Sequence, residues 1–76
     1  MLYKRLADLR NDHDKTQAQL AEYLHCNPLV YGRYERGVRE IPAWMVVELA
    51  KYYEVSSDYI FGLTDEPRPY PRKTHT

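Results

Sequence analysis

The 76-residue chain lacks the features that mark several large classes of protein. It has a single cysteine, Cys26, so an internal disulfide is impossible, and a free thiol is typical of a reducing compartment. No apolar run approaches the length that spans a membrane, and residues 1–4 do not open a signal peptide. We therefore expect a cytoplasmic protein without a membrane partner, in which Cys26 is a small packing residue.

The groups that catalysis or metal binding would require are also missing from the sequence. His13, His25 and His75 are scattered without ligand spacing, and no histidine or cysteine partner lies near them. No nucleophile with a base and an orienting group is recognisable, and there is no glycine-rich phosphate loop. We expect no enzyme activity, no metal and no cofactor.

The formal net charge is zero, but the charges are unevenly distributed. Residues 1–40 carry seven Lys or Arg and six Asp or Glu. Residues 41–66 carry one Lys and five acids, and residues 67–76 carry three bases. This distribution is compatible with one face directed at a polyanion, although it is a weak signal.

The sequence does contain helical periodicity. Leu2, Leu6 and Leu9 fall at i, i+4 and i+7, which predicts a helix over residues 2–12 with these leucines on its buried face. No stretch alternates with period two over a useful length, so we expect no strand. A chain of this length allows one domain with a small core.

The stretch from residue 16 to residue 37 predicts two short helices joined by a tight turn. Thr16 is a good N-cap for the first helix, and Asn27 followed by Pro28 marks the start of the second. Gly37 ends the second helix. This order of elements predicts a helix-turn-helix motif.

A fourth helix is predicted to begin at Pro42 and to continue to about residue 53. Its inner face is marked by Val46, Leu49, Ala50 and Tyr53. Trp44 and Tyr52 lie outside that stripe and could form an exposed aromatic patch with Tyr59, as the interface of a weak homodimer. Alternatively, Trp44 folds back under the connector beside Ile41.

A last short helix is expected over residues 58–61, capped by Ser56 or Ser57 and ended by Gly62. Residues 63–76 contain three prolines and cannot be helical. We expect a frayed end there, rather than a basic arm or a docking peptide. The sequence thus predicts an all-α domain of five helices over residues 1–62, followed by a Pro-rich tail.

Several residues occur in the register of a known family. They are Leu9-Arg10, Thr16-Gln17, Leu20-Ala21, Leu24, Arg33, Glu35-Arg36-Gly37 and Ile60-Phe61-Gly62. With them the chain resembles the DNA-binding domain of the lambda-repressor/Cro (Xre) helix-turn-helix family. The chain also resembles the branch of this family found in phage-like and mobile-element regulators. The residues that carry this likeness are Tyr31, Tyr34, Arg39-Glu40-Ile41-Pro42 and Tyr52-Tyr53. The resemblance implies a compact five-helix fold and a duplex-DNA-binding repressor that acts as a dimer on two half-sites.

The resemblance also implies roles for individual residues. It assigns Gln17 to a DNA phosphate, at a helix start where N–H groups and the helix dipole favour an anion, although a solvated Gln17 is the alternative. The helix over residues 28–36 would lie in the major groove. Its outward positions would be Pro28, Leu29, Gly32 and Arg33. Arg33 matches the O6 and N7 atoms of guanine, and Leu29 can touch a thymine methyl group.

Direct base readout by this helix is expected to be sparse. Arg33 and Asn27 are the residues whose side chains could form hydrogen bonds with a base edge. DNA shape supplies the remaining specificity, or the domain is instead a protein-interaction module, antitoxin-like or accessory, with weak DNA binding. Arg36 and Arg39 are either phosphate contacts or solvated surface. In the family, the positions of Arg10 and Glu35 often hold an ion pair that joins the first and third helices, so we expect a structural pair there.

Overall fold

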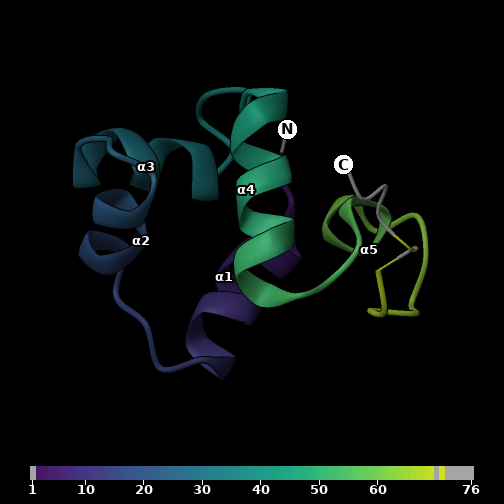
Figure 1. Cartoon of the computed structure of the whole chain (residues 1–76). Helices are drawn as coiled ribbons and strands as arrows, with labels where there is room; N and C mark the ends of the chain where they lie inside the picture. Colours follow the sequence, from purple (N-terminus) through teal and green to yellow (C-terminus); the bar gives the residue numbers. More distant parts are fainter. Residues whose placement is uncertain (1, 70, 72–76) are drawn as a thin grey trace, which may run out of the picture.

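The computed structural model describes residues 2–69 and 71. In this part of the chain there are five helices and no strand. The helices are α1 (Lys4–Asp12), α2 (Gln17–Tyr23), α3 (Pro28–Glu35), α4 (Ala43–Tyr53) and α5 (Ser57–Phe61). Figure 1 shows α2 and α3 on one side of α4, and α5 on the other. The predicted all-α, five-helix architecture is confirmed.

Side-chain caps set the starts of three helices. Thr16 and Gln19 form a capping box, in which the Thr16 hydroxyl accepts from the Gln19 N–H and the Gln19 side chain accepts from the Thr16 N–H. The Asn27 side chain accepts from the Leu29 N–H at 2.8 Å, and the Ser56 hydroxyl starts α5 in the same way. These bonds satisfy N–H groups that have no partner inside the helix.

The first predicted helix is wrong at its start. α1 begins at Lys4, and Leu2 remains 59% exposed, so the buried stripe contains only Leu6 and Leu9. Leu2 lies before the first turn, where its side chain does not follow the helical repeat. Pro42 likewise precedes α4 as its N-cap and is not its first residue.

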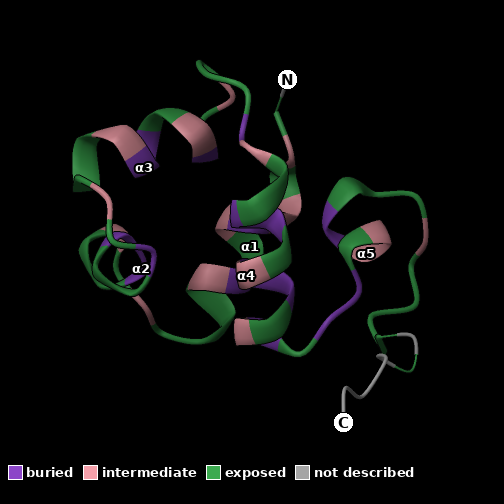
Figure 2. Ribbon diagram, turned by 45° about the horizontal axis from the view of Figure 1, so that its top comes forward, coloured by how far each residue is buried: buried purple, intermediate pink, exposed green. Residues whose placement is uncertain are grey.

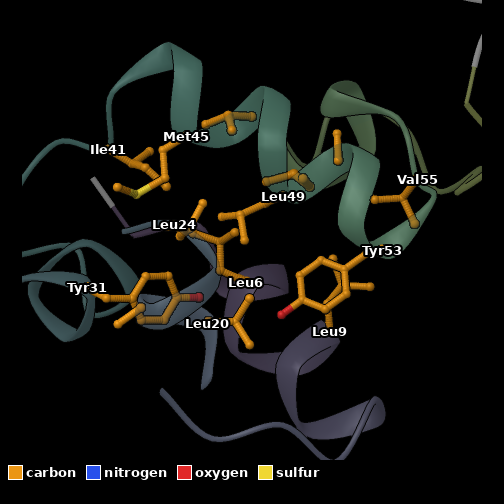
Figure 3. Packing of buried hydrophobic residues seen from close by; sticks show 14 residues of the cluster. Leu6, Leu9, Leu20, Leu24, Tyr31, Ile41, Met45, Leu49, Tyr53 and Val55 are labelled. Atoms are coloured by element: carbon orange, nitrogen blue, oxygen red, sulfur yellow. The ribbon is translucent and has the colours of Figure 1, made fainter. Parts of the chain in front are cut away.

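The core is built from apolar side chains of all five helices. Its buried members are Leu6, Leu9, Leu20, Ala21, Leu24, Tyr31, Ile41, Met45, Val46, Leu49, Ala50, Tyr53, Val55 and Ile60. Figure 2 shows the buried residues on the inward sides of the helices, and Figure 3 shows the side chains meeting between α1 and α4. The predicted inner face of α4 is confirmed. Cys26 packs against this core, and its burial raises the pKa of the thiol.

Arg5 on α1 holds the end of α5 and the segment that follows it. Its guanidinium donates to the backbone carbonyl oxygens of Tyr59, at 2.8 Å, and Thr64. It also donates to the Asp65 carboxylate at 2.6 Å, and it lies 4.0 Å from the centroid of the Tyr59 ring. The chain after α5 is therefore attached to α1.

A second bond fixes the Pro-rich segment against the start of α5. The Ser56 N–H donates to the Pro67 carbonyl oxygen at 3.0 Å. Residues 63–69 are non-helical, as expected, but their first part is anchored and does not fray. Most of the predicted basic tail, residue 70 and residues 72–76, lies outside the described residues.

Candidate nucleic-acid interface

An ion pair joins α1 to α3 beneath the predicted recognition helix. Arg10 donates from Nε to Glu35 Oε2 and from Nη2 to Glu35 Oε1, both at 2.9 Å. The two side chains are only 16% and 4% exposed. Arg10 also donates to the Lys15 carbonyl oxygen at 3.0 Å. A guanidinium with two parallel bonds to one carboxylate fixes orientation as well as distance, so α3 is held rigidly on α1.

Gln17 connects α2 to the same carboxylate. Its Nε2 donates to Glu35 Oε1 at 3.3 Å, so Glu35 receives hydrogen bonds from both α1 and α2. Burial by itself would raise the pKa of Glu35, but the bonds from Arg10 and Gln17 outweigh it and the pKa is lowered. Glu35 therefore stays ionised and ties three helices together.

The outer side of α3 carries few polar side chains. Leu29 is 74% exposed, and Pro28 and Arg33 are exposed beside it. Arg36 and Arg39, which follow the helix, are exposed as well. The side-chain oxygen of Asn27 is engaged as the cap of α3. Its side-chain nitrogen is the group that could serve as a donor to DNA.

Gly32 does not face solvent, so its predicted outward position is wrong. The point where a Cβ atom would stand lies 2.9 Å from Arg36 Nη1 and 3.1 Å from Gln17 Oε1. Helical side chains lean toward the N-terminus, so Arg36 covers the residue one turn before it. The helical repeat alone misses this cover, because it comes from the reach of two long side chains.

The geometry described so far agrees with comparisons to known proteins. A family model described as "Helix-turn-helix" matches residues 6–60. The chain belongs to the lambda-repressor/Cro-like (Xre) helix-turn-helix family. It is 45% identical over 69 residues, or 91% of its length, to YobD, an "uncharacterized HTH-type transcriptional regulator" of Bacillus subtilis (strain 168). The chain spans 62% of that relative's length. No solved structure matches it significantly.

This Xre-family domain has two buried tyrosine hydroxyls close to the Glu35 carboxylate. In the described part of the chain, the Tyr53 hydroxyl has no hydrogen-bond partner, and the Tyr31 hydroxyl is buried next to the Glu35 carboxylate, whose pKa it helps to lower. Figure 3 shows both rings inside the core with their hydroxyls pointing inward. Burial, and next the negative charge of Glu35, raise the pKa of each hydroxyl, so both stay protonated.

The predicted aromatic patch does not form a single surface. Trp44 is 55% exposed, which also excludes its folding under the connector beside Ile41. Tyr52 is half-buried, with its ring centroid 4.6 Å from that of Tyr23 on α2. Tyr59 instead lies on α5 under Arg5, and Figure 1 shows α5 on the other side of α4 from α2.

A shallow hollow beside α2 contains an aromatic residue that the sequence analysis did not select. Tyr23, 40% exposed, lines this hollow together with Trp44 and Glu48. Tyr23 is the last residue of α2. The helical repeat of the sequence does not show whether an aromatic residue at that position is buried or exposed.

Two negative findings concern metal ligands and membrane spans. Among residues 2–69 and 71, no group of three or more His, Cys, Asp or Glu is placed to hold a metal ion. In the same part of the chain, no helix is long and apolar enough to cross a membrane.

Proposed function

We propose that the domain binds duplex DNA as a repressor, with α3 in the major groove. The observation that carries this proposal is the two-sided character of α3. One side, through Glu35, is bonded to α1 and α2, while the other presents Leu29 and Arg33 to solvent. A recognition helix needs both properties, because base contacts require a rigidly held side chain and an unobstructed face.

The exposed residues divide into two kinds of DNA contact. Arg33 bonds a guanine edge, and Pro28 and Leu29 pack on thymine methyl groups, while the free amide nitrogen of Asn27 adds a donor. Phosphates are contacted by Gln17, Arg36 and Arg39. Because few side chains can read base edges, DNA shape supplies much of the specificity.

The domain acts as a weak homodimer on two half-sites about one helical turn apart. The residues of α5 and its surroundings support this, since Leu2, Phe61 and Leu63 are exposed there, at 59%, 37% and 75%. Tyr59 borders that surface, whereas Trp44 and Tyr52 lie across α4 and would belong to another contact. The branch resemblance, which includes Tyr31 and Tyr34, supports a repressor of the phage or mobile-element type.

Selection of bound sequences from a random duplex pool tests this function directly. We expect a two-fold repeated sequence, and Arg33→Ala to cost about 1–3 kcal/mol at one base position in each half-site. Gln17→Ala should weaken all duplexes similarly, while Lys51→Ala, on the exposed side of α4, serves as the control. If neither Gln17→Ala nor Arg33→Ala changes DNA affinity at low salt, the groove assignment is wrong.

A second candidate is a protein-interaction module that keeps the fold with weak DNA binding. The exposed Trp44 beside Tyr23 is the observation in its favour, because exposed aromatic residues are enriched at protein interfaces. Failure to recover any duplex from the pool at low salt would favour this alternative.

A further inference from the structure

Gly32 lies in the middle of α3, where glycine is a poor choice for helix stability. Its backbone does not require glycine, because positive φ among the glycines occurs at Gly37 and Gly62. The space beside its Cα is instead occupied by two side chains. Arg36 Nη1 and Gln17 Oε1 lie 2.9 and 3.1 Å from the point where a Cβ would stand.

The two side chains approach this point from different helices. Arg36 follows α3 and leans back by one turn, while Gln17 comes from the first turn of α2. The Gln17 amide is oriented by its bond to Glu35, so its nitrogen faces the carboxylate and its oxygen lies beside Gly32. One N–H of that amide remains available.

We infer that Gly32 is a positioning residue, whose missing side chain lets Gln17 and Arg36 together hold one phosphate of the DNA backbone. The free Gln17 N–H and the Arg36 guanidinium donate to the same phosphodiester, an anion that arginine binds with high directional specificity. A Cβ at residue 32 would force the Arg36 guanidinium to move, since 2.9 Å is shorter than carbon atoms tolerate, and would push the Gln17 amide, at 3.1 Å, slightly aside. This inference rests on the proposed function.

The test measures binding to a fluorescein-labelled 20-base-pair duplex of random sequence by anisotropy, between 50 and 200 mM salt. We expect Gly32→Ala to lower affinity several-fold and to reduce the slope of log K against log salt by about 1, the value for one lost phosphate contact. Its melting temperature should be unchanged or higher, because alanine is the better helix former. Arg36→Gln should reproduce the change in slope, while Lys51→Gln should not.

The double variant and an NMR measurement separate positioning from general disturbance. In the Arg36→Gln background, Gly32→Ala should cause little further loss. Without DNA, Gly32→Ala should shift the side-chain amide signal of Gln17. The inference is overturned if Gly32→Ala binds like the wild type, loses as much affinity without Arg36, or leaves that signal unmoved. A wild-type domain without salt-dependent binding would instead refute the proposed function.

Discussion

Two arginines of α1 each tie this helix to a distant segment, but they do so with different partners. Arg10 is bonded to the carboxylate of Glu35, which is 4% exposed. Arg5 is bonded to two backbone carbonyl oxygens and to Asp65, whose side chain is fully exposed. One end of the molecule is therefore held by a buried charge pair and the other by a clamp on the backbone.

The difference lies in what remains when the arginine is removed. Without Arg10, Glu35 is left as a buried charge lacking its cation, which is among the costliest defects in a small domain. Without Arg5, the freed carbonyl oxygens lie near the surface and can bond water instead. The α3 end is thus fixed to the global fold, whereas the α5 end can loosen locally.

The largest effect is expected at the ion pair. Arg10→Ala should lower the free energy of unfolding by about 3–5 kcal/mol, the range for breaking one side of a buried pair. Glu35→Ala should cost less, because the Arg10 side chain, 16% exposed, can turn toward water. In urea unfolding, the double variant should cost less than the two single variants together. Strict additivity would contradict the coupling.

An intermediate effect is expected at the backbone clamp. Arg5→Ala should cost about 1–3 kcal/mol, since it removes charged hydrogen bonds to carbonyl groups. Hydrogen exchange should show lost protection in α5, with protection in α3 retained. Asp65→Asn is the matched control. It should leave the free energy of unfolding unchanged within error, because the Asp65 carboxylate is fully exposed. Equal loss of protection in α3 and α5 would mean that the two ends do not differ.

The smallest effect is expected in the dependence of stability on acidic pH. The pKa of Glu35 is lowered in the folded state from its ordinary value of 4.5. Its ionised form therefore stabilises the fold above that value, and this contribution is lost as the pH falls through the folded-state pKa. Glu35→Gln should flatten the dependence of unfolding free energy on pH below about 4.5. Glu66→Gln should flatten it less: Arg68 also lowers the pKa of Glu66, but solvent screens that exposed pair. Parallel pH curves for wild type and Glu35→Gln would disprove this assignment.

Local chemistry explains which parts of the fold could be predicted. Thr16, Asn27 and Ser56 act within three residues of themselves, so the sequence shows their capping partners directly. The family register predicts the pairing of Arg10 with Glu35, which composition or periodicity would not.

The structural features that could not be predicted depend on interaction partners that cannot be identified from the sequence. Arg5 bonds backbone carbonyl oxygens, and every residue has one, so nothing in the sequence marks those of Tyr59 and Thr64 as its acceptors. The cover over Gly32 depends on side-chain reach between helices. The prediction that Leu2 is buried in the first helix was wrong because a helical repeat does not show where the helix begins.

The partners of Arg5 also affect when the domain can complete its fold during synthesis. They lie 54, 59 and 60 residues further along the chain. A ribosome adding about 5–20 residues per second makes the last of them roughly 3–12 s after Arg5. Until then α1 can pair with α3 through Arg10 but has no clamp at its other end. The helix-turn-helix half can therefore assemble on the nascent chain first, and α5 closes onto it afterwards.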